Sequence, residues 1–422
     1  MADAKQFRAP RGVADILPEE QPYWRWVRDT AARIAESYGY QRIDTPIFEF
    51  AGVWERREAA GTDIVDKEIY RFRDRGGDEL ALRPDVTAGV CRAYIQHGMA
   101  SRPQPVRLYY IGPVFRYDRP QAGRYRVHHQ FGAEAIGDES AALDAEVIDL
   151  LRTLYDTLGL SDYLLHLNSI GDGRCRPAYI ERLRAYYRDK LDRLCGDCRR
   201  RFEVNPLRLL DCKNEPCQPF KPGAPKIADY LCEACAAHFG ALQSYLEALG
   251  IDFDIDHTLV RGLDYYTRTA FEFIPRGDES QQGTLGGGGR YDGLIEQLGG
   301  RPTPGVGFGT GIERIILNLK RKEVGPPPPA PPDAFIAVAA AEAQAAALRL
   351  ARDLRARGAT VVLGAAERSL KAQMRQADAM GARRALILGR EELEGGAVTV
   401  RDLEAATQER VALGELPRLF AR

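Results

Sequence analysis

A run of prolines constrains this chain more than any other feature. The segment from Gly325 to Asp333 reads GPPPPAPPD. Proline fixes φ and lacks a backbone N–H, so this stretch is excluded from helices and central strands and favours an extended polyproline conformation. We therefore expect separate folded parts: residues 1–325, a proline-rich linker at 326–332, and a second domain at 333–422.

The residues after the linker alternate between apolar runs and helical patterns. Strands are expected at Ala334 to Ala340, Thr360 to Leu363, Arg384 to Leu388 and Val398 to Val400. One helix is expected to end at Arg357, and a second is expected from Ser369 to Met380. This order is typical of a small α/β domain. Such a domain could serve dimerisation or stability, or it could bind a partner, and the composition does not decide between these roles.

The larger part predicts an α+β fold. Apolar residues at helical spacing indicate a first helix over Glu19 to Tyr38, followed by the strand-like RIDTPIFEF. Further strands are expected at Glu79 to Leu82, Val106 to Phe115, His128 to Ala135, Tyr163 to Leu167, Thr269 to Phe273 and Thr284 to Leu285. Helices are expected at Val86 to Gln96, Ala141 to Leu158, Pro177 to Cys195 and Gly311 to Lys320. Short polar turns between strands favour an antiparallel sheet flanked by helices, with a helical insertion at about residues 172–250.

Composition and charge narrow the class of protein. With 45% hydrophobic and 28% charged residues, the chain is not disordered. Lys plus Arg is 59 and Asp plus Glu is 60, so the net charge of −1 excludes a protein that coats nucleic acid through bulk charge. No apolar run approaches the roughly 18 residues of a membrane span, and the first residues lack a signal or transit pattern. We expect a cytoplasmic protein without a membrane partner.

One loop concentrates arginine. Between Arg107 and His129 the chain carries five Arg against one Asp. The planar guanidinium grips two phosphate oxygens at once, so this loop suits phosphate, although a solvated loop with ion pairs is the plain alternative. Arg116 ends an apolar strand, where it would need a buried anionic partner, and Glu134 points inward from the same sheet.

Two later blocks are also candidates. TLVRGLDYYTRTAFEF sets Arg261 and Asp264 beside Tyr265 and Tyr266, either to bind a small polar ligand or as surface arginine and core tyrosine. GTLGGGGRYDGL and TPGVGFGTGIERIIL are rich in glycine, which lets a backbone approach a ligand or simply forms a flexible loop. The helix that follows carries Glu313 and Arg314 in its first turns.

Six of the eight cysteines crowd into the insertion, while Cys91 and Cys175 stand apart in sequence. Cys195-x₂-Cys198 has zinc-ligand spacing, either with Cys232-x₂-Cys235 or with Cys212-x₄-Cys217. Plain thiols are the other interpretation, and disulfides are disfavoured without a secretion signal. From sequence we assign no metal ligand and leave a structural zinc open.

Several motifs resemble one family in its own order. RGVADILPEE, LRPDVTAG, FRYDRPQAGRYR, HHQFGAEAIG, LVRGLDYYTRTAFEF, GGRYDGL and GVGFGTGIERI are similar to those of histidyl-tRNA synthetases, which are class II aminoacyl-tRNA synthetases. SLKAQMRQADAMGARRALILGREELEGGAVTVRDL, after the linker, resembles the family's anticodon-binding domain. The resemblance implies a class II synthetase catalytic domain and a C-terminal α/β anticodon-binding domain.

The resemblance also implies an activity: ATP-dependent formation of histidyl-adenylate with Mg²⁺, then transfer of the histidyl group to tRNA(His) by a homodimer. The family pattern assigns Arg116, Arg261 and Arg314 to catalysis. It assigns Arg116, Arg124, Tyr125 and Arg314 to ATP, and it assigns histidine to Asp85, Thr87, Gln130, Glu134, Tyr265 and Tyr266. The alternative is a non-catalytic, histidine-binding regulatory subunit of ATP phosphoribosyltransferase. That subunit generally lacks both the RGLDYY block and the C-terminal domain, and this chain has both.

Overall fold

The computed structural model describes residues 7–55, 68–118, 123–262, 265–277, 284–328 and 330–420. The chain divides into two compact units, Met1–Pro326 and Pro327–Arg422. The division falls within the proline-rich segment. Each unit has its own hydrophobic core.

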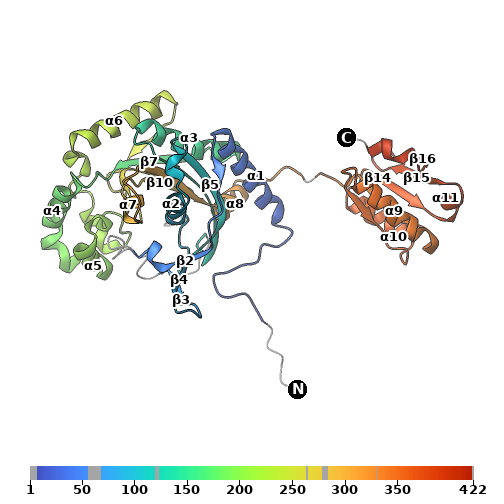
Figure 1. Ribbon diagram of the computed structural model, residues 1–422, viewed down its shortest axis with the longest axis horizontal. Coiled ribbons are helices and arrows are strands. Elements are labelled where there is room, and N and C mark those ends of the chain that lie inside the picture. Colours follow the sequence, from blue (N-terminus) through green and yellow to red (C-terminus); the bar gives the residue numbers. More distant parts are fainter. Residues whose placement is uncertain are drawn as a thin grey trace, which may run out of the picture. The chain divides into compact units, whose positions relative to one another are not determined.

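An eight-stranded sheet forms the centre of the first unit, in the order β1-β5-β6-β11-β10-β9-β7-β8 (Figure 1). Its strands are β1 (Gln41–Arg42), β5 (Val106–Phe115), β6 (Val127–Ile136), β7 (Tyr163–Ser169), β8 (Asp254–Ile255), β9 (Thr267–Pro275), β10 (Gly286–Arg290) and β11 (Gly305–Gly311). The neighbours from β5 to β7 pair antiparallel, as expected. At the two edges of the sheet, β1 and β8 pair in parallel with their neighbours, which the sequence did not predict.

Helices α1 (Gln21–Ser37), α3 (Ala141–Thr157) and α8 (Ile312–Arg321) cover one face of this sheet. In α1, Trp24, Val27, Ala31 and Ile34 recur at helical spacing, and all four are buried. Together with apolar residues of α3 and α8 they form the larger core against the sheet. Helix α2 (Thr87–Gln96) belongs to a second core, with α7 (Leu294–Gln297).

The stretch RIDTPIFEF contains fewer strand residues than the sequence predicts. Only β1 and β2 (Phe48–Phe50) are extended strands, and they belong to different sheets. Strand β2 pairs with β4 (Glu79–Leu82), which also pairs with β3 (Tyr70–Arg73) in a small antiparallel sheet. The proline in this stretch, Pro46, lies between the two strands because it cannot donate to a ladder.

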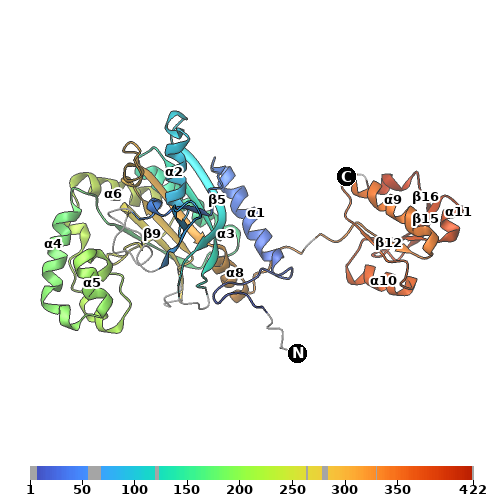
Figure 2. The ribbon, with the colours of Figure 1, turned by 60° about the horizontal axis from the view of Figure 1, so that its bottom comes forward.

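The insertion is built from helices and turns and lies to the left of the large sheet in both views (Figures 1 and 2). Its α-helices are α4 (Arg176–Tyr187), α5 (Gly196–Val204) and α6 (Glu233–Ala248), separated by short 3₁₀ segments. The prediction of one helix from Pro177 to Cys195 is wrong at its end. Helix α4 stops at Tyr187, and Arg188–Arg193 continues as a 3₁₀ helix.

The glycine-rich blocks are not loops. Gly286–Arg290 is β10, a fully buried strand that pairs with β9 and β11, so the strand predicted at Thr284 to Leu285 begins later than expected. Gly305–Gly311 is the neighbouring strand β11. Glycine is scarce in strands because it has no side chain to pack. The many glycines in β10 and β11 therefore indicate that other groups occupy the space where their side chains would lie.

The second unit has a five-stranded sheet in the order β13-β12-β14-β15-β16. Its strands are β12 (Ala334–Val338), β13 (Val361–Leu363), β14 (Arg384–Leu388), β15 (Ala397–Asp402) and β16 (Gln408–Ala412). The helices are α9 (Gln344–Arg355), α10 (Leu370–Ala379) and α11 (Arg390–Glu394). The predicted α/β pattern is confirmed, with β16 as an additional strand. None of the described helices of the whole chain has the length and apolar character to cross a membrane.

Candidate active site

A buried carboxylate lies at the centre of the large sheet. Glu134, on β6, is completely shielded from solvent. Its Oε1 accepts hydrogen bonds from Thr87 Oγ1 at 2.7 Å and from the Tyr110 hydroxyl at 3.4 Å. Its Oε2 accepts from the Tyr291 hydroxyl at 2.6 Å. Every one of these donors is neutral, so the carboxyl group has hydrogen bonds but no counter-charge among the partners described.

Burial raises the pKa of Glu134 to about 8, against an ordinary value of 4.5. The hydrogen bonds from Thr87 and Tyr291 lower the pKa, and the neighbouring Asp85 raises it further. Desolvation wins because a neutral donor offsets only part of the cost of removing a charge from water. The fold therefore holds a carboxyl group ready for a cationic or N–H-bearing partner.

Aromatic and polar side chains complete this carboxylate pocket, which we define as Asp85, Thr87, Tyr110, Gln130, Glu134, Tyr265, Tyr266 and Tyr291. Tyr265 and Tyr266 are both buried, with ring centroids 4.8 Å apart. Burial is the main cause that raises the pKa of the Tyr265 hydroxyl, and the nearby charges of Asp85 and Glu134 raise this pKa further. Asp85 Oδ1 also accepts from the backbone N–H of Ala88 at 3.1 Å, so the carboxylate holds the first turn of α2.

The glycines of β11 make room for the pocket. A Cβ atom at Gly307 would lie 1.9 Å from Glu134 Oε2, and one at Gly309 would lie 1.6 Å from Gln130 Nε2. The neighbouring strand β10 does the same for two other side chains. A Cβ at Gly287 would lie 2.9 Å from Arg261 Nη1, and one at Gly289 would lie 2.9 Å from the Tyr266 ring. The glycines therefore let polar side chains lie flat across the sheet.

Two polar atoms of this region are buried without a hydrogen-bond partner among the described residues: Gln130 Oε1 and Arg261 Nε. A buried unpaired donor or acceptor costs roughly 1–3 kcal/mol. Such atoms in a concave polar site are groups that a ligand would satisfy. Gln130 lies four residues before Glu134 on β6, which places both side chains on the same face of the strand.

Arg261 connects this pocket to a second carboxylate. Its Nη1 makes an ion pair with Glu272 of β9, and its guanidinium lies 5.7 Å from the centroid of the Tyr266 ring. Glu272 Oε2 also accepts from Thr284 Oγ1 at 3.2 Å. Asp264, noted beside Arg261 in the sequence, lies outside the described residues, as does the loop 119–122.

Next to these residues lies the arginine cluster, defined as Arg116, Arg124 and Arg314. Arg314, in the first turn of α8, donates to the main-chain oxygens of Gly123 at 3.1 Å and Thr284 at 2.7 Å. Burial lowers its pKa, and the charges of Arg124 and Arg116 lower it further, which shows that the three guanidiniums are neighbours. Clustered guanidiniums form a positive site that suits an anion such as phosphate.

The other members of the cluster are held by different contacts. Arg116 Nε donates to the main-chain oxygen of Pro84 at 2.8 Å. Arg124 Nη1 pairs with Asp118 Oδ2 at 3.3 Å. Tyr125 is half-buried beside Arg124, and its main chain hydrogen-bonds with the His128 side chain. Burial and the charges of Arg116 and Arg314 lower the pKa of His128 to about 3, so this imidazole stays neutral.

The structure therefore brings the predicted residues into two adjoining groups, the carboxylate pocket and the arginine cluster. Sequence reasoning missed Tyr110, Tyr291 and Arg83. Arg83 is 5% exposed, and its Nη1 donates to the Thr45 main-chain oxygen at 2.8 Å while its Nε donates to that of Pro113 at 2.8 Å. Arg83 and Tyr291 lie in the motifs LRPDVTAG and GGRYDGL, to which the sequence drew attention without indicating a role for these two residues. Tyr110 is hidden in an apolar strand and gave no signal.

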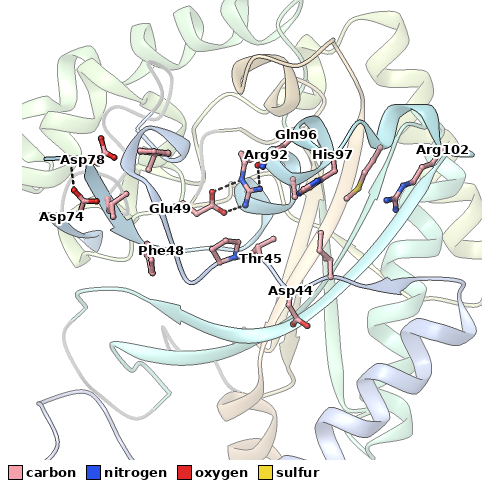
Figure 3. A pocket seen from close by; sticks show the side chains of 16 residues that line it. Asp44, Thr45, Phe48, Glu49, Asp74, Asp78, Arg92, Gln96, His97 and Arg102 are labelled. Carbon is pink, nitrogen blue, oxygen red and sulfur yellow. Dashed lines mark hydrogen bonds and ion pairs between the residues drawn. The ribbon is translucent and has the colours of Figure 1, made fainter. Parts of the chain in front are cut away.

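A separate groove lies at the small sheet, lined by Thr45, Phe48, Glu49 and Arg92 among others (Figure 3). Arg92 makes two contacts with Glu49, from Nε at 2.8 Å and from Nη2 at 2.5 Å. No residue of the carboxylate pocket or the arginine cluster is among the described residues that line it.

Comparison with known proteins identifies the family. The family model for histidyl-tRNA synthetase matches residues 12–171 and 221–315, and that for the anticodon binding domain matches residues 333–422. A histidine-tRNA ligase of Dehalococcoides mccartyi is 56% identical over 410 residues, covering 97% of this chain and 98% of its own. That of Moorella thermoacetica is 50% identical over 404 residues, covering 96% of this chain and 95% of its own.

A solved structure agrees with these matches. The crystal structure of apo histidyl-tRNA synthetase from S. aureus superposes with a TM-score of 0.83 at 36% identity, covering 99% of this chain and all of that one. The matches thus extend through both units, and the motifs that form the carboxylate pocket and the arginine cluster lie inside the matched segments. By sequence, by fold and by the residues gathered at its buried site, this chain belongs to the histidyl-tRNA synthetase family.

Proposed function

We propose that the protein activates L-histidine with ATP to give histidyl-adenylate and then transfers the histidyl group to tRNA(His). The observation that carries this proposal is the pairing of two sites. A buried carboxylate that needs an N–H or cationic partner lies beside a cluster of arginines that needs an anion. Histidine and the phosphates of ATP supply both at once.

The carboxylate pocket suits the side chain of histidine. A neutral imidazole has one N–H donor and one acceptor nitrogen. Glu134 accepts a hydrogen bond from the N–H of the ring, and the hydroxyl of Tyr266 donates one to the other ring nitrogen. An apolar side chain of similar size would leave both protein groups buried and unpaired, which a site of this kind rejects strongly. Tyr265 closes the pocket against Tyr266.

Histidine's α-amino group has its own partners. Asp85 supplies a nearly buried negative charge, and Thr87 and the unpaired Gln130 Oε1 supply hydrogen-bond acceptors. An ammonium has three donors and no acceptor, so an acidic, acceptor-rich site is complementary to it. The carboxylate of the same amino acid is then directed away from Asp85 and Glu134, toward the arginines.

The phosphates of ATP fit the arginines. We assign Arg116 and Arg261 to the α-phosphate, approached from opposite sides, and Arg314 to the γ-phosphate. Arg124 and Tyr125 belong to the loop that contacts the nucleotide. ATP enters as its Mg²⁺ complex, so magnesium arrives with the substrate, and Glu272 is the carboxylate nearest the phosphate-directed Arg261. Oxygen ligands from a carboxylate and phosphates are those that Mg²⁺ prefers.

The reaction then needs positioning more than covalent help. An oxygen of the histidine carboxylate attacks the α-phosphorus in line, a P–O bond forms, and the bond to the β-phosphate oxygen breaks, which releases pyrophosphate. Negative charge grows on the α-phosphate oxygens, and Arg116 and Arg261 stabilise it there. In the second step a hydroxyl at the 3′ end of the tRNA attacks the histidyl carbonyl, and AMP leaves.

The second unit, with its α/β sheet, is assigned to the tRNA anticodon. Its match to the anticodon binding domain model supports this role. Because the net charge of the whole chain is −1, tRNA binding depends on local contacts of this kind and not on bulk charge.

We further propose that the protein acts in the cytoplasm as a homodimer. Exposed aromatic residues gather on the small sheet, where two of them line the groove of Figure 3: Phe48 is 49% exposed, Phe50 is 61% exposed, and the Phe48 ring contacts that of Phe72. An apolar patch of this kind marks a contact surface. Sedimentation should give twice the chain mass, and Phe50→Asp should give a monomer. A monomeric parent protein would refute the assignment.

Histidine-dependent exchange of pyrophosphate into ATP, without tRNA, tests the activity. Exchange with histidine, and not with the other proteinogenic amino acids, would support activation and its specificity in one measurement. A folded protein that binds histidine but exchanges with no amino acid would instead support the regulatory subunit of ATP phosphoribosyltransferase.

A further inference from the structure

Three helices of the insertion begin at a cysteine. Cys175, Cys195 and Cys232 are the N-cap residues of α4, α5 and α6, and none of their side chains caps the helix by a hydrogen bond. Ser, Thr, Asp and Asn are the residues that stabilise this position, and cysteine is not among them. Some other requirement has therefore placed thiols at the three helix starts.

The first group of thiols meets at one point. The sulfur atoms of Cys195, Cys198, Cys212 and Cys217 all lie within 4.8 Å of one another, and that of Cys195 is 3.8 Å from that of Cys212. A tetrahedral zinc with bonds of about 2.3 Å has sulfur atoms about 3.8 Å apart. Cys198, Cys212 and Cys217 are buried. Of the two cysteine pairings left open by the sequence, the fold thus brings together Cys195-x₂-Cys198 and Cys212-x₄-Cys217.

Polar groups around these sulfurs point toward them. Asn214 Nδ2 donates to Cys195 Sγ at 3.1 Å, and the backbone N–H of Cys195 donates to Cys217 Sγ at 3.4 Å. Hydrogen bonds of this kind orient and stabilise thiolate ligands in metal sites. The start of α5 adds the positive end of a helix dipole, which also favours thiolate over thiol.

The second group joins the segment that follows β7 to the start of α6. Asp172, Cys175, Cys232 and Cys235 each offer a ligand atom within 4.8 Å of the others, although Cys175 stands apart in sequence. Asp172-x₂-Cys175 has the same spacing as Cys232-x₂-Cys235. Asp172 Oδ1 lies 3.6 Å from Cys175 Sγ, while its Oδ2 accepts from Arg174 Nη2 at 2.9 Å. The arginine thus holds the carboxylate with one oxygen turned to the sulfurs.

We propose that the insertion binds two Zn²⁺ ions, one held by Cys195, Cys198, Cys212 and Cys217 and the other by Asp172, Cys175, Cys232 and Cys235. Each set supplies four ligands and leaves no open position, which is the arrangement of structural zinc. Thiolates select zinc or iron, and the close spacing of the ligand atoms leaves room for a single ion and not for a multi-iron cluster. The described insertion from Arg176 to Ala248 consists of helices and turns without a strand, so a bound metal would cross-link segments that no sheet joins.

The second site also adjoins the carboxylate pocket. Arg176, next to Cys175, donates from Nη2 to the main-chain oxygen of Tyr266 at 2.7 Å. Arg268, two residues beyond Tyr266, lies 3.8 Å from Asp172 Oδ2. A metal that fixes Asp172 and Cys175 therefore supports the segment that carries Tyr266.

Metal analysis of the full-length protein, purified without chelator from cells supplied with zinc, tests both sites. We expect two zinc ions per chain, and one ion fewer in each of Cys212→Ser and Cys232→Ser. Cys91→Ala, which removes a thiol from α2, is the matched control and should keep both ions. A serine variant that retains the parent's zinc content overturns the site it alters. A parent protein with well under one zinc per chain, or with iron instead, overturns both.

A second measurement does not depend on ligand loss. Asp172→Cys should complete a second set of four thiolates, so zinc should pass from this variant to an added chelator more slowly than from the parent. An unchanged rate would refute Asp172 as a ligand. In the parent, modification of the thiols with p-mercuribenzoate should release two zinc ions to a metal-sensitive dye, and absence of release would refute the proposal even if the serine variants fail to fold.

Discussion

Replacing Glu134 by glutamine tests the histidine pocket most directly, because the change keeps the size of the side chain, removes its charge and turns one of its two acceptor oxygens into a donor. A carboxylate that accepts an N–H bond from the imidazole is a charged partner, and such bonds contribute roughly 1.5–3 kcal/mol. At 1.36 kcal/mol for each tenfold change, Glu134→Gln should lower kcat/KM for histidine about 10- to 150-fold in the pyrophosphate exchange assay. The loss should fall mainly on KM for histidine, with KM for ATP little changed.

The same substitution has an opposite effect on stability. The pKa of Glu134 is raised from 4.5 to about 8, so the folded state binds more protons than the unfolded state between these pH values. The stability that this group contributes is complete below pH 4.5 and is lost as the pH rises to 8. The loss reaches about 5 kcal/mol, at 1.36 kcal/mol for each pH unit of the shift. Glutamine cannot ionise, so the variant should lack this loss.

Urea unfolding at pH 5 and pH 9 measures the difference. Between these two values the parent should lose several kcal/mol more stability than Glu134→Gln. Glu247→Gln, an exposed carboxylate-to-amide change on α6, is the matched control and should behave as the parent in both assays. The reasoning is refuted if Glu134→Gln keeps the parent's KM for histidine, or if its stability falls with pH as steeply as that of the parent.

Three further predictions address the other parts of the site. Arg261→Ala should cost the activation step about 3 kcal/mol of transition-state stabilisation, roughly 150-fold in exchange, and leave tRNA affinity unchanged; equal losses in both would show that the role is misassigned. Gly307→Ala should raise KM for histidine more than about tenfold, because its Cβ would lie 1.9 Å from Glu134 Oε2, and normal histidine binding in this variant would contradict the packing argument. A chain ending at Gly325 should retain exchange but lose tRNA charging by about tenfold or more, and undiminished charging would contradict the anticodon assignment.

Much of the fold follows from local patterns. The spacing of Trp24, Val27, Ala31 and Ile34 predicts α1 and its buried face, and proline at the linker predicts the division into two units. These features depend on residues close in sequence. The parallel edge pairs of the large sheet depend on contacts between distant segments, which no local pattern encodes.

The site was less accessible to sequence reasoning. The run Gly286–Arg290 looks like a loop because glycine disfavours strands, but Cβ atoms there would collide with Arg261 and Tyr266. The need for space overrides the strand propensity. Tyr110 and Tyr291 donate to Glu134 from strands and turns that are far apart in the sequence, so their convergence is visible only in three dimensions.

The free site is held in an unfavourable state by the rest of the fold. Glu134 lacks a counter-charge, Gln130 Oε1 and Arg261 Nε lack partners among the described residues, and Arg314 lies among like charges. The surrounding sheet, with its glycine strands, over-determines these positions, so they do not relax when the site is empty. Histidine and ATP together would satisfy all of them, whereas either substrate alone would satisfy only a part.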